Sequence, residues 1–281
     1  MSNGERRTLA LLVTLLLIAI PALGQTEVAI EPDRPDVTDG TRIVPTGLIQ
    51  IEFGGMYTRD TPEQTGATSP FTIRIGIADW IEARFGADGV ATQNGPDANG
   101  TGFGNIQLGA KVRLWAQPGG APVLSILPSI NLPTADASKG LGSGDADFTI
   151  ALLTGTDIRK RGHIDFNYGV GAIGGGDGRP HYVQHLLSAS LSEAVTDRLN
   201  PYVEVFWLSR TGIDTAPETA IDTGVIYELG SHLALDGGVQ FGVAGPASDF
   251  GIFGGVSVIL GGERNLNGRD RKVKAPKVKR R

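Results

Sequence analysis

The chain of 281 residues contains no cysteine and only two methionines. Without cysteine it cannot form a disulfide framework or a thiolate metal site. Beyond the first 24 residues it also has no apolar run of the roughly 20 residues that a membrane-spanning helix needs. This last absence does not exclude a membrane barrel, because alternating strands give only a weak hydropathy signal. What the chain has in abundance is glycine, at 41 residues, which suits strands whose backbones approach closely.

Residues 1–24 have the pattern of a secretory signal peptide. Arg6 and Arg7 form a charged start, and an apolar run extends from Leu9 to Ile20. Small residues follow, so we expect cleavage after Gly24 and a mature chain that is exported. A membrane anchor is the alternative, but the run is shorter than a spanning helix requires.

Charge is distributed unevenly along the chain. Between Gln25 and Leu260 there are 14 Lys and Arg against 27 Asp and Glu, a net charge of −13. Residues 261–281 carry 9 Lys and Arg against 2 Asp and Glu, a net charge of +7. A basic tail of this kind is typical of a disordered segment that binds a polyanion. For an exported protein we expect anionic cell-wall polymer as the partner of the tail, and no nucleic acid.

Apolar and polar residues alternate with a period of two from residue 48 to residue 260, which is typical of strands with one apolar face. The apolar faces of the expected strands contain no Asp, Glu, Lys or Arg. With the residues that flank the alternating positions, each expected strand is about ten residues long, the length that a tilted strand needs to cross a bilayer. Twelve segments show the pattern: 49–57, 71–77, 81–85, 106–114, 124–130, 148–152, 164–170, 187–191, 203–207, 221–227, 233–241 and 252–260.

The connections between these segments alternate between short turns and long loops. Short turns at one end and long loops at the other are typical of an up-and-down transmembrane β-barrel. We therefore predict an all-β, antiparallel barrel of about 12 strands over residues 48–260, preceded by a periplasmic segment or plug at residues 25–47. A soluble β-sandwich or a secreted barrel is the rival, since alternation alone does not say which face meets solvent.

The polar face of each expected strand would line the lumen of the barrel. Inward glycines, Gly54 and Gly76 among them, would keep space open there. We expect a narrow or partly blocked lumen, because twelve strands lie between a filled barrel and a water channel. The charged residues predicted to line it are Glu52, Arg74, Glu82, Arg84, Lys111, Arg113, Asp147, Asp165, Glu204, Asp222 and Asp236.

Several short motifs occur in an order that resembles one known family. They lie at 33–39, 44–47, 50–52, 102–111, 132–134, 195–199 and 202–204. Over roughly Glu31 to Leu260 the chain is similar to the outer-membrane transporters grouped under the label "MetA-pathway of phenol degradation". The resemblance implies an outer-membrane barrel that passes small, aromatic or hydrophobic molecules. One departure is that members usually end at the last strand, often on an aromatic residue, whereas here Leu260 takes that place and the basic tail follows.

A hydrolase triad would require Ser, His and an acidic residue side by side. His163 and Asp165 share one face of an expected strand, and Ser188, Ser190 and Ser192 share a face of another. No nucleophile motif surrounds these serines, so we interpret all five as polar lumen residues.

Two further patterns could suggest a metal. His181 and His185 lack the glutamate of the metalloprotease motif. Asp33, Asp36 and Asp39 do not match an EF-hand loop.

We therefore predict no catalytic, cofactor or metal residue. The expected partners are outer-membrane lipid and a small-molecule permeant. A structural barrel that anchors the envelope through its basic tail and a barrel enzyme acting on outer-membrane lipid remain as alternatives.

Overall fold

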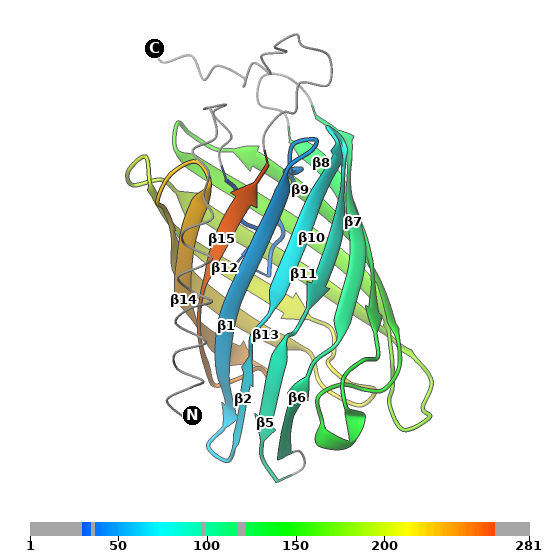
Figure 1. Ribbon diagram of the computed structural model, residues 1–281. Helices are drawn as coiled ribbons and strands as arrows, with labels where there is room; N and C mark the ends of the chain where they lie inside the picture. The colour runs from blue at the N-terminus through cyan, green and yellow to red at the C-terminus, as the bar shows by residue number, and fades with distance from the viewer. Residues whose placement is uncertain (1–29, 35–36, 97–98, 117–121, 262–281) are drawn as a thin grey trace, which may run out of the picture. The chain divides into compact units, whose positions relative to one another are not determined.

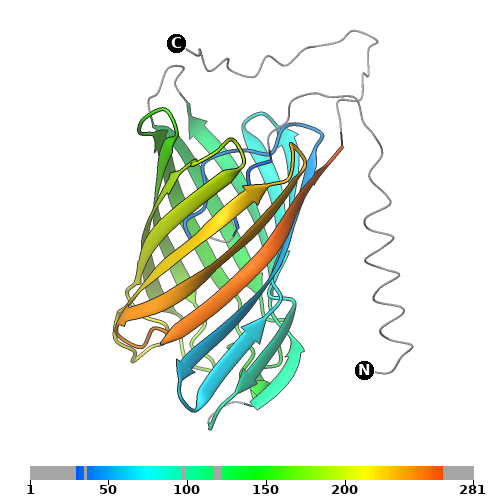
Figure 2. The same cartoon turned by 90° about the vertical axis from the view of Figure 1, so that its left-hand side faces the viewer.

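The computed structural model describes residues 30–34, 37–96, 99–116 and 122–261. Within them one antiparallel sheet closes on itself (Figures 1 and 2). No helix of these residues is long and apolar enough to cross a membrane. The elements are β1 (Ile49–Thr61), β2 (Gln64–Thr68), β3 (Phe71–Ala78), β4 (Ile81–Ala87), β5 (Val90–Asn94), β6 (Asn99–Phe103), β7 (Ile106–Trp115), β8 (Val123–Leu132), the 3-10 helix η1 (Ala137–Lys139), β9 (Asp147–Asp157), β10 (Gly162–Ile173), β11 (Tyr182–Glu193), β12 (Leu199–Leu208), β13 (Glu218–Glu228), β14 (Leu233–Ala244) and β15 (Phe250–Leu260).

Twelve of these strands form the ring, in the order β1, β3, β4 and then β7 to β15. The ring closes where β15 pairs with β1, from Ile49 opposite Leu260 to Arg59 opposite Phe250. Closure gives every strand of the ring two neighbours, so no edge of this ring is left open. The prediction of an antiparallel barrel of about 12 strands is confirmed, and each predicted segment falls on a different strand of the ring.

At the long-loop end, three short strands, β2, β5 and β6, extend the sheet beyond the ends of β3, β4 and β7. β2 continues the line of β3, since β1 pairs with β3 through Phe53 and with β2 from Met56 onward. β2 pairs with β5, and β5 pairs with β6, which precedes β7 along the chain. From the sequence we expected long loops at residues 59–70 and 88–101. That prediction is wrong where β2, β5 and β6 form. These short strands are rich in Thr, Gln and Gly and lack a regular apolar face, so the alternation that marks the other strands is missing.

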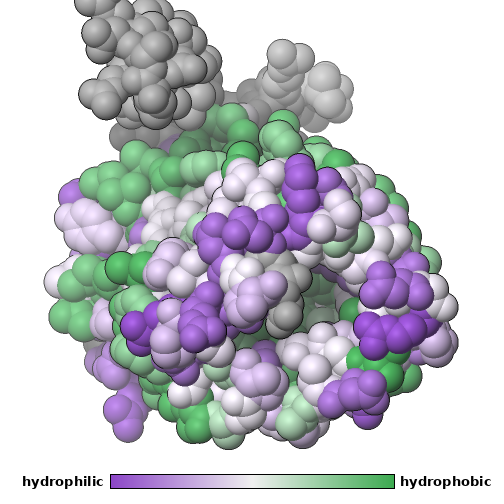
Figure 3. Space-filling model, turned by 90° about the horizontal axis from the view of Figure 1, so that it is seen from below, coloured by the Kyte–Doolittle hydropathy of each residue, from purple (hydrophilic) through white to green (hydrophobic). Residues whose placement is uncertain are grey.

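The apolar face of the strands points outward. Phe53 on β1, Phe166 on β10 and Val205 on β12 are about half exposed, and their neighbours along each strand are buried, or half-buried at Asp165. Figure 3 views the end that carries β2, β5 and β6, where hydrophilic residues gather around a central hollow and hydrophobic residues lie at the outer margin. An apolar exterior around a polar interior is the reverse of a soluble barrel and suits a hydrocarbon surrounding.

Residues 30–34 and 37–46, which we call the lumen segment, lie inside the ring at the short-turn end (Figure 2). The backbone of this segment adds no strand to the sheet. Its contacts are with inward side chains of strands on several sides of the barrel. The segment therefore occupies space that a bare barrel would leave open.

The apolar face of the strands points outward, so we expect the free-energy cost of a charged side chain on that face to depend on its depth in the bilayer. Val205→Arg, on the outer face of β12, should lower the free energy of unfolding in lipid vesicles by about 2–4 kcal/mol. Val243→Arg, near the long-loop end of β14, is the matched control and should cost about 0–1 kcal/mol. If urea titration of the two refolded variants gave equal losses in the free energy of unfolding, the outward placement of the apolar face in the bilayer would be contradicted.

Candidate functional site

The candidate site is the lumen, where most of the predicted lining residues lie. Glu52, Arg74, Glu82, Lys111, Glu204 and Asp222 are at most 2% exposed. Arg84, Asp165 and Asp236 are also turned inward, with side chains 10%, 17% and 1% exposed. Arg113 and Asp147 lie apart from this group: Arg113 donates to the Asp79 carbonyl at 3.3 Å, and Asp147 accepts from the Gly174 amide at 2.8 Å.

One carboxylate of the lumen segment joins three cations of the barrel wall. Asp33 Oδ2 lies 2.6 Å from Arg84 Nη1, 2.5 Å from Lys111 Nζ and 3.1 Å from Arg74 Nη1. These cations come from β3, β4 and β7, which are adjacent in the ring. A buried charge costs several kcal/mol unless it is paired, so Asp33 and the three cations stabilise one another.

Two glutamates of the wall complete this ionic cluster. Arg74 Nε donates to Glu82 Oε1 at 2.8 Å, and Arg74 Nη1 donates to Glu52 Oε1 at 3.1 Å. Glu52 also accepts from the amides of Asp33 and Arg34, at 3.3 and 3.1 Å. Glu82 Oε2 accepts from the Val44 amide at 2.7 Å. The same carboxylates therefore neutralise the wall and bind the backbone of the lumen segment.

The pKa values of the two aspartates of the segment move in opposite directions. Burial disfavours the Asp33 carboxylate, but Arg74, Lys111 and Arg84 outweigh it and hold the pKa of Asp33 well below its ordinary value. Burial raises the pKa of Asp39, because Arg84, 3.1 Å away, offsets only part of the cost. Three cations therefore favour the ionised form of Asp33, which anchors the segment.

The opposite side of the lumen holds the segment by different contacts. Glu204 on β12 accepts from the amides of Val37 and Thr38 at 2.8 and 2.6 Å. Arg34 Nη2 lies 3.5 Å from Asp236 on β14. The segment thus bridges two sides of the barrel.

Two inward glycines lie directly against the lumen segment. A Cβ on Gly76 would lie 2.1 Å from the Pro45 carbonyl oxygen, and one on Gly54 would lie 2.1 Å from Arg34 Nη2. We expected these glycines to keep the lumen open, and that prediction is wrong at both positions. The space that their missing side chains leave is filled by the segment.

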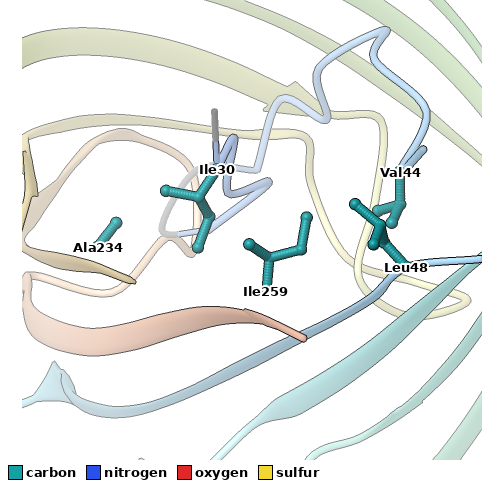
Figure 4. Close-up of a cluster of buried hydrophobic side chains, with 5 residues drawn as sticks. All are labelled: Ile30, Val44, Leu48, Ala234 and Ile259. Carbon is teal, nitrogen blue, oxygen red and sulfur yellow. The ribbon is translucent and has the colours of Figure 1, made fainter. Parts of the chain in front are cut away.

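An apolar cluster packs around the segment near the short-turn end (Figure 4). Ile30 and Val44 of the segment pack with Leu48, Ala234 and Ile259, all of them buried. These contacts fix both ends of the lumen segment against β14, β15 and the residue that precedes β1.

One inward row of side chains, which we call the apolar wall, is apolar except for Asn167 and Ser188 between its members, and the sequence did not predict it. Its clearest members are Leu153 on β9, Phe206 on β12 and Ala220 on β13, at most 6% exposed. Phe206 and Ala220 are opposite each other in the register of their strands. The available signal was that both alternating faces are apolar at Leu152–Leu153 and at Val205–Phe206, where a polar lumen residue is expected.

A cavity of about 360 Å³ lies between the lumen segment and the wall that β9 to β13 form. Within it, His163 Nδ1 lies 2.7 Å from Asp157 Oδ1 and its Nε2 lies 3.2 Å from Asp165 Oδ2. An imidazole that holds a carboxylate at each nitrogen has no nitrogen free to accept a proton from a serine. This arrangement does not support the triad that we considered.

The metal alternatives find no support either. His181 Nε2 contacts the Ala146 carbonyl and His185 Nδ1 contacts the Tyr168 hydroxyl, so the two histidines have separate partners. Asp33 and Asp39 both contact Arg84, while Asp36 lies outside the described residues. Over residues 30–34, 37–96, 99–116 and 122–261, no group of three or more His, Asp or Glu is placed to hold a metal ion.

Asp33→Asn should loosen the lumen segment, because three buried cations lose their shared carboxylate. Removing one partner of a buried ion pair costs about 3–5 kcal/mol. Hydrogen exchange of the amides of residues 30–46 should therefore accelerate in the refolded variant. Glu31→Gln, which removes the surface pair with Arg42, is the control and should leave exchange deeper in the segment unchanged. Unchanged exchange in Asp33→Asn would contradict the anchor role.

Asp33 should stay ionised in mild acid. Its lowered pKa means that its stabilising contribution is present at neutral pH and is lost only when the pH falls through the folded value. The ¹³C carboxyl shift of Asp33 should remain that of a carboxylate down to about pH 3, below the ordinary aspartate pKa of about 3.9. A titration midpoint near the ordinary value would show that the three cations do not hold this carboxyl.

Comparison with known proteins agrees with this architecture. No curated protein sequence matches the chain. Among solved structures, the COG4313 outer membrane channel from Pseudomonas putida F1 is 12% identical and has a TM-score of 0.63, covering 82% of this chain and 100% of that one. The KdgM porin in complex with disordered oligogalacturonate is 9% identical and the NanC porin 10% identical; each has a TM-score of 0.52 and covers 74% of this chain and 98% of its own. These likenesses show the barrel fold.

The family model described as "Putative MetA-pathway of phenol degradation" matches residues 32–259, which include most of the lumen segment and nearly the whole ring. The match confirms the family that the sequence motifs indicated, and the chain belongs to the family of that description.

Proposed function

We propose that this protein is an outer-membrane channel for small apolar or aromatic molecules, and that the lumen segment controls its opening. The observation that carries the proposal is a closed barrel, apolar outside, whose lumen is occupied by a non-strand segment held through polar contacts. Ile30 and Val44 pack in an apolar cluster, whereas the stretch between them is held by ionic and backbone contacts. Ionic and backbone contacts can exchange partners, so they suit a segment that moves.

The apolar wall inside the barrel supports the class of permeant. Leu153, Phe206 and Ala220 would contact an apolar molecule, and polar residues on the adjacent strands would give it weak alternative contacts. Weak contacts at several positions allow a permeant both to enter and to leave. The family description names phenol degradation, which favours the same class, and one similar structure is an outer membrane channel, which favours passage through the barrel.

The same proposal includes export with cleavage after Gly24, outer-membrane lipid around the barrel and anionic cell-wall polymer on the basic tail. Both residues 1–24 and most of the tail lie outside the described residues. A structural barrel that anchors the envelope is the second candidate, because the lumen segment occludes part of the lumen. It differs from the channel in predicting no conductance in any variant.

Single-channel recording of the refolded mature chain in a planar bilayer tests the proposal. Wild type should show brief openings, and Asp33→Asn should raise the fraction of time spent open by more than about tenfold, since losing a buried ion partner costs well over the 1.4 kcal/mol of a tenfold change. Asp197→Asn, on an exposed turn, is the control and should behave as wild type.

Dye uptake by cells that lack other porins tests which class of molecule passes through the barrel. The uptake of 1-N-phenylnaphthylamine, an apolar aromatic dye, should rise on expression of Asp33→Asn and should rise less with wild type. Inserted protein that neither conducts nor admits the dye in any variant would favour the structural anchor.

A further inference from the structure

Two buried carboxylates face each other on the wall opposite the ionic cluster. Glu204 on β12 and Asp222 on β13 are direct register partners and are 1% and 2% exposed. Residues directly opposite in an antiparallel pair have Cβ atoms about 4.5–5.5 Å apart. Two carboxylates at that spacing in a buried site repel each other unless a proton or a cation joins them.

No side-chain cation of the described residues is paired with this carboxylate pair. The next residue across the sheet from Asp222 is Gln240, which is uncharged. The nearby charge on the lumen segment is Asp39, another carboxylate, which is paired with Arg84. Arg34 contacts Asp236 instead. Even if the two carboxylates share one proton, the pair carries a negative charge with which no side-chain cation of the described residues is paired.

The two members of the pair differ in their hydrogen bonds. Both oxygens of Glu204 accept from backbone amides, those of Val37 and Thr38. Asp222 Oδ1 is buried and has no hydrogen-bond partner among the described residues. A buried oxygen without a partner loses its hydration and gains nothing in return. Backbone amides supply N–H donors but no positive charge, so they satisfy Glu204 and leave the charge of the pair in place.

An apolar surface adjoins the pair on the same strands. Phe206 lies two residues beyond Glu204 on β12, and Ala220 lies two residues before Asp222 on β13, so all four side chains point inward. A ligand that reaches the carboxylates would thus lie with its remainder against an apolar wall.

We propose that Glu204 and Asp222, together with the wall at Phe206 and Ala220, bind an amphiphilic primary amine, whose place the amides of Val37 and Thr38 take when the segment is seated. An ammonium group brings three N–H donors and one positive charge, which is what the pair lacks. The inference rests on the proposed channel function and narrows its permeant from apolar molecules to apolar molecules with a cationic nitrogen. The amine displaces the Val37–Thr38 backbone from Glu204, so binding and loosening of the segment occur together.

Equilibrium dialysis of hexylammonium and of hexan-1-ol against the refolded mature chain in a zwitterionic detergent tests this, with protein-free detergent as the blank. Wild type should bind hexylammonium about tenfold or more tighter than hexan-1-ol, as expected for charge-assisted hydrogen bonds. Asp222→Asn should reduce the affinity for hexylammonium to that for the alcohol, and Asp197→Asn should leave both affinities unchanged. Correct folding of each variant is checked by its heat-modifiable migration on a gel.

The other outcomes refute the amine site, the apolar permeant class or the displacement of the segment, as follows. If wild type binds both probes equally, or if Asp222→Asn keeps the preference, the amine site is refuted while the apolar channel stands. If neither probe binds above the blank, the amine site and the apolar permeant class are both refuted. A second readout is hydrogen exchange at Val37 and Thr38, which hexylammonium should accelerate and hexan-1-ol should not. Exchange that hexylammonium leaves unchanged refutes the displacement of the segment.

Discussion

The arrangement of the lumen depends on how the buried cations of one wall are neutralised. Arg74, Arg84 and Lys111 project inward from adjacent strands, and the side chains of Arg74 and Lys111 are almost completely buried. Glu52 and Glu82 supply two of the negative charges, and Asp33 supplies one that all three cations share. Because an unpaired buried charge is strongly destabilising, the barrel and its N-terminal segment stabilise each other.

This charge requirement explains several features that would otherwise be unrelated. The segment needs room, and Gly54 and Gly76 provide it by lacking side chains where the segment lies. The segment also needs partners for its backbone, and inward carboxylates provide them at Arg34, Val37, Thr38 and Val44. The same residues that make the wall polar therefore hold the segment that narrows the passage.

The two sides of the lumen consequently differ in what they offer a permeant. The side formed by β3, β4 and β7 has its charges satisfied by the segment. The side formed by β9 to β13 presents apolar residues interspersed with polar ones, and the Glu204–Asp222 pair, with which no described cation is paired. In the proposed channel a permeant would contact both surfaces only when the segment shifts, so the proposal couples selection of the permeant to opening.

The sequence by itself determined the ring. Period-two alternation is a local property, and consecutive strands of an up-and-down barrel are neighbours in space, so twelve local patterns were enough to predict the order of the strands and which residues share a face. Which face points outward was predicted from the alternation of short turns and long loops together with the signal-like start of the chain. The extensions β2, β5 and β6 were missed because their pairing rests on backbone hydrogen bonds and they carry no regular apolar face. The inward residues were predicted one by one from the same alternation, but it could not say which of them would pair.

Only the tertiary structure determined where the N-terminal segment lies and which charged groups of the lumen pair with one another. The Val37 amide donates to Glu204, which is 167 residues away along the chain, and Lys111 donates to Asp33, which is 78 residues away. No local pattern encodes contacts of that separation, because they follow from closure of the ring around the segment. The apolar inner wall was hidden for a related reason: whether an apolar residue on the polar face of a strand is tolerated depends on what lies across the lumen.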